Sequence, residues 1–368
     1  MYLPQYHCIP ENNEFWGEGF TDWVTVKKAT PLWEGHNQPR IPMNSNYYDL
    51  SQEENVRWQC KLAKEYGIYG FGIYHYWFNN EKNLLTKPAE IILENKDIDT
   101  HYFFAWDNGN WKRSWSNVQG NDWAPLVETE QQKQNGPQIL IPYILGDMPD
   151  WENHYNFLRP FFMDERYIKL DNRPIFIIYN YSEKILEMAD YWSELARKDG
   201  FDGVRIIYRY QESGRFKRNS VIDVSEYQYN YEPIFNGWLD TTLYERIAGK
   251  IKILKDGGKR KGLRVLDYDK VWNGILKSAE SRFCRPNFFH GCFVSYDDTP
   301  RRGNNGTLIK GGTPEKFGRY LKKLVDISEQ QGKEFIFLTA WNEWGEGAYL
   351  EPDTVNGYSY LEVIKSII

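Results

Sequence analysis

Eight short apolar runs, separated by longer stretches, constrain the fold of this chain more than any other feature. Each run is typical of a buried strand in its length and composition. The runs span residues 2–7, 68–78, 102–106, 173–179, 204–208, 221–227, 289–296 and 335–339. Eight strands with intervening helices fit an α/β fold of the (β/α)8 TIM-barrel type. The chain has 368 residues, so we predict one catalytic barrel domain over residues 1–368, with long active-site loops.

A doubly wound sheet is the alternative that the same alternation allows. Such sheets commonly cradle phosphates with glycine-rich loops, and no GxGxxG or GxxxxGK[ST] motif follows the early strands. In a barrel, polar residues at the carboxyl ends of the strands converge on one rim. His75, Asp107, Glu226, Asp297 and Glu343 occupy such positions, so the barrel is favoured.

Several local patterns predict where helices begin or fail to form. Ser51 and Glu54 have the spacing of a capping box that opens a helix. Thr313 followed by Pro314 predicts a second helix start. Residues 146–162 do not read as a normal helix, so 138–162 is predicted to be an insertion over the barrel rim.

Composition narrows the class of ligand. Aromatic residues make up 17% of the chain, with 15 Trp and 27 Tyr. Trp and Tyr combine an apolar face with a polar handle, which suits sugars, although an aromatic-rich core explains many of them. The net charge of −6 lacks the basic footprint of a nucleic-acid-binding protein.

Targeting and redox features suggest a reducing compartment. No apolar run of about 18 residues is present, as a membrane span requires. No signal peptide is visible at the N-terminus, which starts directly in a predicted strand and looks truncated, so we expect a cytoplasmic protein. The four cysteines show no disulfide spacing, which agrees with free thiols.

The segment FIFLTAWNEWGEGAYLE at residues 335–351 is the strongest candidate for an active site. It places Glu343 and Glu346 in a glycine-containing loop directly after a buried strand. Glycosidic chemistry typically needs two carboxyl groups near the scissile bond, and two close carboxyls push each other's pKa values apart. We therefore predict Glu343 and Glu346 as catalytic residues. The alternative is that one of them caps the loop or pairs with an arginine.

Other polar and aromatic residues near strand ends are candidates for binding the sugar. They are Tyr6, His75, Trp77, Trp106, Asp107, Asn110, Trp111, Glu226, Asp297, Arg301, Trp341, Asn342 and Trp344. A buried structural histidine is the alternative for His75. Trp106, Asn110 and Trp111 are predicted to form a stacking wall, with ordinary loop packing as the alternative. For Asp297 and Arg301 an ion pair that holds the rim is slightly favoured over substrate binding.

No metal or cofactor is expected. The chain has no HExxH motif, and its six histidines are scattered. Two Asp-x-Asp triplets, at 97–99 and 267–269, could suggest a site for a metal–nucleotide-sugar complex. Neither follows a convincing buried strand, so we discount both.

With these residues identified, the chain resembles the WbsX-like family, which is related to glycoside hydrolase family 99. The similarity runs along nearly the whole chain in several long motifs. They are YLPQYH at 2–7, FWGEGFTDW at 15–23, GFGIYHYWF at 70–78, FFMDERYIKLDNRPIFIIY at 161–179, DDTPRRG at 297–303 and AWNEWGEGAYLEPD at 340–353.

The resemblance implies a (β/α)8 barrel and a link to lipopolysaccharide O-antigen gene clusters. Family 99 enzymes are endo-acting α-mannosidases and mannanases. By similarity of the NEWxEG segment, Glu343 would be the base that deprotonates the sugar's 2-hydroxyl, which gives a 1,2-anhydro intermediate. Glu346 would be the acid that protonates the leaving oxygen and then the base that activates water.

One segment departs from the family pattern. WbsX-like chains usually read like WANENW after the third strand, whereas this chain reads WDNGNW. Gly109 stands where a glutamate is expected and Asp107 where an alanine is expected, which bears on the identity of the substrate.

Three functions follow as hypotheses. The first is a retaining, metal-independent glycoside hydrolase-like enzyme that acts on an oligosaccharide or polysaccharide, such as a mannose-like bacterial glycan. The second is a glycosyltransferase or transglycosylase that builds surface polysaccharide, as WbsX-like proteins are commonly labelled. The third is a glycan-binding barrel without catalysis.

Overall fold

The computed structural model describes residues 1–112, 139–210, 226–239 and 262–368. These residues form two compact units that interleave along the sequence. Within the described residues, unit 1 comprises 1–19, 48–112, 139–210 and 226–229, and unit 2 comprises 20–47, 230–239 and 262–368. We describe each unit by itself.

Unit 1 contains a mainly parallel sheet. Its parallel strands are adjacent in the order β1-β3-β7-β8-β9, and β2 and β6 pair antiparallel with β1 and β7. A separate pair joins β4 to β5. The bounds are β1 Gly70–Asn79, β2 Lys82–Leu84, β3 His101–Trp106, β4 Trp111–Lys112, β5 Ile139–Ile141, β6 Lys169–Leu170, β7 Arg173–Ile178, β8 Arg205–Arg209 and β9 Tyr227–Tyr229.

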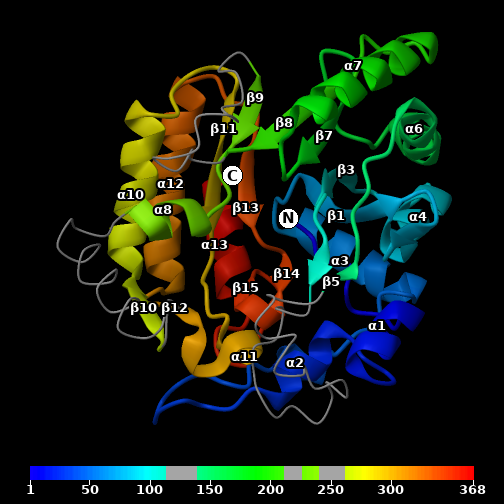
Figure 1. Ribbon diagram of the computed structural model, residues 1–368. Coiled ribbons are helices and arrows are strands. Elements are labelled where there is room, and N and C mark those ends of the chain that lie inside the picture. Colours follow the sequence, from blue (N-terminus) through cyan, green and yellow to red (C-terminus); the bar gives the residue numbers. More distant parts are fainter. Residues whose placement is uncertain (113–138, 211–225, 240–261) are drawn as a thin grey trace, which may run out of the picture. The chain divides into compact units, whose positions relative to one another are not determined.

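Helices connect the parallel strands of unit 1. A helix follows β1, β3 and β7 before the next parallel strand begins, which is the βαβ arrangement that the sequence predicts. Figure 1 shows α6 and α7 next to each other beside these strands. The helices are α1 Pro10–Trp16, α3 Glu53–Glu65, α4 Lys87–Glu94, α6 Met148–Phe162 and α7 Glu183–Lys198.

Unit 2 contains three strand pairs with helices around them. Strands β11 and β13 are parallel, as are β10 and β12, whereas β14 and β15 form an antiparallel hairpin. The strands are β10 Arg264–Asp267, β11 Phe288–Phe293, β12 Thr307–Lys310, β13 Ile336–Thr339, β14 Asn342–Glu343 and β15 Ala348–Tyr349.

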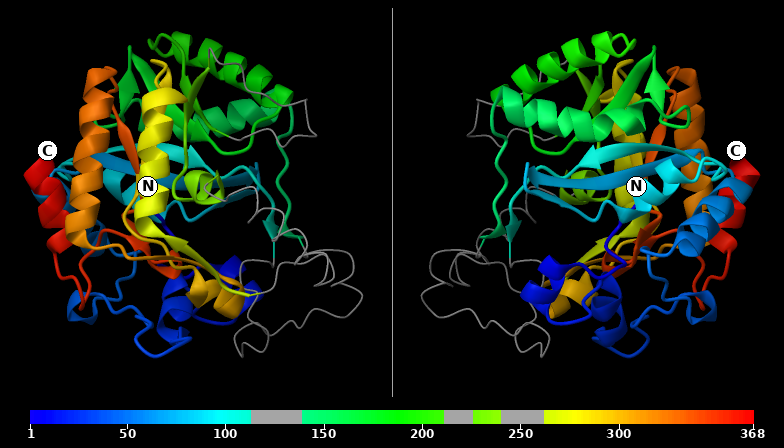
Figure 2. Two further views of the ribbon diagram at one scale, coloured as in Figure 1. Left: turned by 90° about the vertical axis from the view of Figure 1, so that its left-hand side faces the viewer. Right: turned by 90° about the vertical axis from the view of Figure 1, so that its right-hand side faces the viewer.

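Helices α10 and α12 of unit 2 pack side by side (Figure 2). Both present buried apolar side chains at helical spacing, as in Val271, Ile275 and Leu321. The helical elements are α2 Asp22–Lys28, η1 Met43–Ser45, α8 Ile234–Leu239, α10 Tyr268–Ser281, α11 Thr299–Arg302, η3 Gly303–Asn305, α12 Pro314–Gln330, η4 Trp344–Glu346 and α13 Ser359–Ile367.

The predicted α/β class is confirmed. Strands form at six of the eight predicted positions, with ends that differ from the prediction by at most three residues. In neither unit do the paired strands of the described residues close into a ring. Residues 2–7 contribute only one parallel bridge, from Tyr2 to Ile73. Of the prediction for 221–227, residues 221–225 lie outside the described residues, and β9 begins at its last residue.

Two local predictions were wrong. Residues 148–162 form the regular helix α6 and not an excursion, because Asp147 and Asp150 make a capping box and Trp151, His154 and Leu158 give a buried face. Pro149 lies in the first turn, where proline is tolerated. Ser51 does not cap α3, which begins after Gln52 without a side-chain cap. The backbone N–H of Ser51 instead donates to Asp49.

None of the helices in the described part of the chain has the length and apolar composition required to cross a bilayer. The two Asp-x-Asp triplets have local structural partners. Asp97 pairs with Arg57, Asp99 with Lys64 and Asp269 with Lys316. These pairs support our discounting of both triplets.

The N-terminus of α12 gives a stability prediction. The Thr313 hydroxyl accepts a hydrogen bond from the Lys316 N–H at 3.3 Å, as the sequence predicts. We expect Thr313→Ala to lower the free energy of unfolding by about 1 kcal/mol because one backbone donor loses its partner. Chemical denaturation of the full chain measures the change. Ser182→Ala is the matched control, since Ser182 precedes α7 without a side-chain cap, and an equal loss there would contradict the explanation.

Candidate active site

Glu343 and Glu346 lie on a tight hairpin that follows β13. Asn342 pairs with Tyr349 and Glu343 with Ala348, and the single helical turn η4 connects the two strands. Gly347 closes the turn with a φ of 56°, a left-handed conformation that glycine adopts at no steric cost. The predicted glycine-dependent turn is therefore confirmed, and it holds both carboxylates close along the chain.

Arg301 of α11 links the two glutamates to a third carboxylate. Its Nη1 donates to Glu346 Oε1 at 2.7 Å, and its Nη2 lies 3.6 Å from Glu343 Oε2. The same Nη2 lies 3.2 Å from both carboxylate oxygens of Asp22 in α2. One guanidinium thus faces three carboxyl groups. We call Asp22, Arg301, Glu343 and Glu346 the carboxylate cluster.

Gly345 makes this approach possible. A Cβ atom on Gly345 would lie 2.7 Å from Arg301 Nε and 2.7 Å from Asp22 Oδ2. Both distances are below any normal contact, so every other residue would push the arginine or the aspartate away. The glycine is needed here for space, since no unusual φ is involved.

Asp297 positions the backbone of the hairpin. Its N–H donates to the Glu346 carbonyl at 2.7 Å. Its buried carboxylate accepts from Gln38 Nε2 at 2.8 Å and from Thr299 Oγ1 at 2.6 Å, and it lies 3.0 Å from His36 Nε2. Burial opposes its ionisation, but Arg40 and these hydrogen bonds outweigh burial and lower the pKa of Asp297. These contacts favour the structural alternative for Asp297 over substrate binding.

The residues that flank the glutamates in sequence are buried. Trp344 Nε1 donates to Glu351 Oε2 at 2.7 Å, and its ring stacks on Tyr349 with centroids 3.7 Å apart. Trp341 and Asn342 are also buried. In this structure Trp344 packs within the hairpin, as ordinary core aromatics do, and the binding roles of all three residues stay predictions.

In unit 1, His75 packs against helix α6. Its Nε2 lies 2.8 Å from Nε2 of His154, and Trp77 stacks on the His154 ring with centroids 4.3 Å apart. Trp106 is buried beside them and donates from Nε1 to the Trp77 carbonyl at 2.9 Å. These contacts favour a structural role for all three predicted binding residues. Burial lowers the pKa of His75 to about 3 and lowers that of His154 strongly.

The remaining candidates occupy several places in unit 1. Tyr6 is buried against Tyr48. Asn110 Oδ1 accepts from the Tyr143 N–H at 2.6 Å, and Trp111 packs edge-on against Tyr76. None of these contacts tests a role in binding.

Asp107 follows the end of β3, and Glu226 precedes β9 and is half-buried. Burial raises the pKa of Asp107, and Arg209 acts in the opposite direction. At Gly109, where family chains carry a glutamate, a Cβ atom would meet its nearest neighbour at 3.4 Å. The glycine is therefore not required for space, and the departure from the family pattern is a difference of chemistry.

Sequence reasoning missed three residues that interact with predicted site residues, Asp22 and His154 through direct contacts and Arg209 through its electrostatic effect on Asp107. Asp22 lies in a short helix and not at a strand end, and only the FWGEGFTDW motif could have indicated it. His154 lies in the segment that was not predicted to be helical. Arg209 ends β8, and its position at a strand end was an available signal that was not used.

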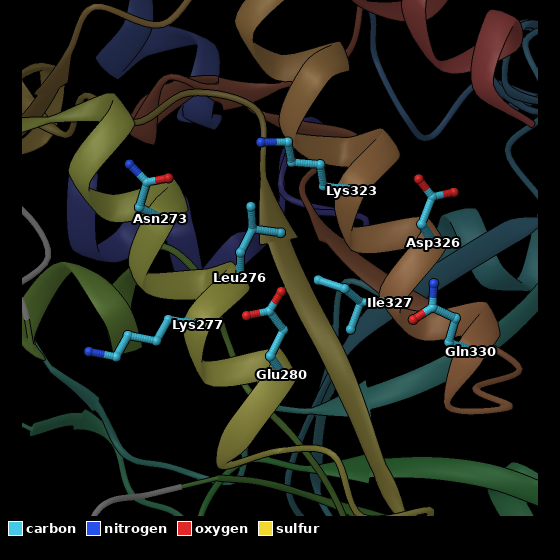
Figure 3. Close-up of a pocket in the computed structure, with 8 residues that line it drawn as sticks. All are labelled: Asn273, Leu276, Lys277, Glu280, Lys323, Asp326, Ile327 and Gln330. Atoms are coloured by element: carbon cyan, nitrogen blue, oxygen red, sulfur yellow. The ribbon is translucent and has the colours of Figure 1, made fainter.

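A groove on the helical surface of unit 2 does not include the carboxylate cluster. It has a volume of about 510 Å³. Figure 3 shows Leu276 and Glu280 of α10 and Ile327 of α12 between the two helices. Within the described residues, no group of three or more His, Cys, Asp or Glu side chains is arranged to hold a metal ion.

Comparison with known proteins identifies a family and a fold. The model of the family described as "Glycosyltransferase WbsX" matches residues 1–364. The protein WxcX of Xanthomonas campestris pv. campestris is 27% identical over 375 residues, with 100% of this chain and 49% of that protein covered. The same protein from strain B100 gives the same values. The chain therefore spans about half the length of these curated relatives.

Two solved structures share the fold. A "glycoside hydrolase-like protein" has a TM-score of 0.55 and 13% identity, and the match covers 89% of this chain and 88% of that one. The GH99 endo-alpha-mannosidase from Bacteroides thetaiotaomicron, in complex with BIS-TRIS-propane, has a TM-score of 0.50 and 13% identity, covering 99% and 94%. At this identity the likeness concerns the fold.

Proposed function

The chain belongs to the WbsX glycosyltransferase family, and from this premise we propose that it is a carbohydrate-active enzyme that acts on glycosidic bonds of a bacterial surface polysaccharide. The carboxylate cluster is the observation that carries the proposal. Two glutamates on one hairpin supply the pair of carboxyl groups that glycosidic chemistry needs. The fold shared with glycoside hydrolase-like proteins agrees with this reading.

In the proposed reaction Glu343 is the base and Glu346 is the acid. Glu343 takes the proton of the sugar's 2-hydroxyl, whose oxygen forms a bond to C1 while the bond from C1 to the leaving oxygen breaks. Glu346 gives its proton to that leaving oxygen. In the second step Glu346 takes a proton from water, the water oxygen forms a bond to C1 while the bond from C1 to the 2-oxygen breaks, and the 2-oxygen regains a proton from Glu343. Two displacements at C1 retain the configuration.

The exposure of the two glutamates agrees with these roles. The Glu346 side chain is 20% exposed, and that of Glu343 is 6% exposed. Glu346 Oε1 accepts from Arg301, and within the described residues Oε2 has no hydrogen bond, so Oε2 is the oxygen that would carry the transferred proton. An acid must reach an oxygen that departs into solvent, whereas a base for a ring hydroxyl can lie deeper.

The charge of the cluster also fits the chemistry. Three carboxyl groups surround one guanidinium in a largely buried place. Glycosidic cleavage passes through a state with positive charge on the sugar ring. Fixed negative charge stabilises such a state more in a buried site than in water.

A glycosyltransferase or transglycosylase is the second candidate, and the description of the family favours it. A transferase would use the same two glutamates with an acceptor hydroxyl in place of water. A glycosyltransferase would require a nucleotide-sugar donor, and a transglycosylase would require an oligosaccharide donor. The third hypothesis, binding without catalysis, predicts no turnover with any donor.

Release of new reducing ends tests the proposal. The full chain is incubated with α-mannans and bacterial O-polysaccharides without a nucleotide sugar. We expect release by the wild type and a loss of at least about 1,000-fold in Glu346→Gln, because the leaving oxygen loses its proton donor. Glu329→Gln, at an exposed position of α12, is the control and is expected to match the wild type.

The other outcomes assign the alternatives. Equal release by the wild type and Glu346→Gln would remove Glu346 from the acid role. No release, together with transfer from a nucleotide sugar, would establish the glycosyltransferase. Binding with neither reaction would establish the glycan-binding alternative.

A further inference from the structure

A second set of polar side chains lies at the carboxyl ends of four parallel strands of unit 1 and, on β1, in the middle of the strand. It contains Tyr74 of β1, Asp107 after β3, Tyr179 after β7, Arg209 of β8 and Tyr229 of β9. Ligands of parallel α/β sheets bind at this end of the strands. We call these five residues the Arg209 cluster. It belongs to unit 1 alone.

The strand register places the five residues on one face of the sheet. Tyr74 pairs with Ala105, Ala105 with Ile177, Ile177 with Ile207, and Arg209 with Tyr229. Side chains two residues apart on a strand point to the same face. Asp107, Tyr179 and Arg209 each lie two residues beyond a member of this row, so they share its face.

Among the residues that the structure describes, the half-buried Arg209 has no acidic partner. Its guanidinium carbon lies 4.9 Å from the centre of the Tyr179 ring. Within the described residues, no carboxylate lies within 4.0 Å of its nitrogens. Arg205 of the same strand is different, because it lies 4.4 Å from the Tyr227 ring and also pairs with Asp171 at 3.2 Å.

An anion bound beside the Arg209 guanidinium would supply the partner of opposite charge. The guanidinium stays charged at any physiological pH and presents its N–H donors in a planar fork that matches a carboxylate or phosphate. The Arg209 guanidinium lies over the Tyr179 ring, and this contact helps to hold it in place. A charged group that is partly removed from water gains most from a partner of opposite charge.

Asp107 is the acidic member of the cluster and can compete with a bound anion for Arg209. It attracts Arg209 electrostatically, yet it makes no ion pair with it at 4.0 Å or less. Burial raises the pKa of Asp107, and Arg209 acts in the opposite direction. The aspartate therefore leaves the guanidinium available.

We propose that the Arg209 cluster binds a carboxylate or phosphate group of a glycan, so that the polysaccharide on which the enzyme acts is acidic. This inference rests on the proposed function for the nature of the ligand. Arg209 would be a specificity-determining residue, with Tyr179 holding its guanidinium in place. Carboxylate and phosphate share the chemistry that a guanidinium recognises.

Binding measurements with the full chain test the inference. Isothermal titration compares D-glucose with sodium D-glucuronate and D-glucose 6-phosphate, which separates the two sources of the anion. We expect at least one anionic sugar to bind about tenfold or more tightly than glucose, with a preference that falls as NaCl is added. In Arg209→Gln the preference should disappear. In Arg205→Gln, the matched control from the same strand, it should remain.

A second variant tests whether a lost preference in Arg209→Gln comes from misfolding. Arg209→Lys keeps the charge but not the fork, and it should retain part of the preference. Equal binding of glucose and both anionic sugars by the wild type would overturn the inference, as would an unchanged preference in Arg209→Gln. Because no turnover is measured, the result is separate from the proposed function. Arg209-dependent anion binding without glycan cleavage would refute only the proposed hydrolase, and cleavage of glycans without the anion preference would refute only this inference.

Discussion

Replacement of Arg301 by glutamine is expected to lower the free energy of unfolding by about 3 to 5 kcal/mol at neutral pH. The Arg301 side chain is 8% exposed and that of Asp22 is 2% exposed. Removing one member of a buried charge cluster takes an ion-pair partner away from the others, and that loss exceeds the net value of the ion pairs. Chemical denaturation of the full chain measures the change.

A double-mutant cycle separates repulsion between the carboxylates from a simple loss of packing. Glu346→Gln removes one negative charge, so it should cost less in the Arg301→Gln background than in the wild type, with a coupling energy of about 1 kcal/mol or more. Additive losses would show that the guanidinium and Glu346 are not coupled. In that case the 2.7 Å contact between Arg301 Nη1 and Glu346 Oε1 would not be part of the stable arrangement.

The neighbouring arginine provides the matched control for this prediction. Arg302 is 49% exposed and faces one carboxylate, Asp298, at 3.3 Å. Water screens the exposed guanidinium of Arg302, although Asp298 is buried, so Arg302→Gln should cost less than about 1 kcal/mol. Losses of equal size at the two arginines would contradict the assignment of a buried cluster to Arg301.

The hairpin that carries Glu343 and Glu346 could be predicted from the sequence because its signals are local. An apolar run, a short polar segment and glycines follow one another within 335–351, and each has a direct structural meaning. The run becomes β13, the polar segment begins the hairpin, and Gly347 takes the left-handed conformation.

The partners of the glutamates could not be predicted in the same way, because their contacts join distant parts of the chain. Asp22 and Arg301 are 279 residues apart, and no spacing rule connects them. The sequence slightly favoured an ion pair for Arg301 over substrate binding. In the structure, Arg301 pairs with Asp22, Glu343 and Glu346. The reason for glycine at position 345 is likewise visible only in the approach of Arg301 and Asp22.

His75 shows why a strand alone does not fix a function. Alternation along β1 places His75 and Trp77 on one face of the strand and Tyr74 and Tyr76 on the other. It does not say which face meets a helix. Once α6 is known to be a helix, His75 has a partner in His154, and its position near a strand end has a structural explanation. The wrong prediction for 148–162 therefore also left the role of His75 open, because its partner His154 lies in that helix.

The stability of the protein is expected to fall steeply as the pH drops below 6.5, and the buried His75–His154 pair is expected to be one of its main causes. Burial lowers the pKa of His75 to about 3 and that of His154 as well. The described groups that face the two rings are aromatic, as in Trp77, Phe104 and Trp192, and no carboxylate within the described residues forms an ion pair with either ring. Below pH 6.5 the unfolded chain binds protons that the folded chain does not. The free energy of unfolding therefore decreases by up to about 1.4 kcal/mol per pH unit for each histidine, until the pKa of the folded state is reached.

Two variants distinguish this titration from a loss of packing. In His75→Gln one of the two proton-binding groups is gone, so the slope of the unfolding free energy between pH 6.5 and 5 should fall by about 1.4 kcal/mol per pH unit at most. Phe157→Leu removes a ring that stacks on His75 with centroids 5.6 Å apart but leaves both histidines. It should lower stability by a similar amount at every pH and keep the slope of the wild type, because no proton-binding group changes. An unchanged slope in His75→Gln would mean that the unfolded and folded chains bind the same proton at this site, and the aromatic enclosure would then not exclude the charged imidazole.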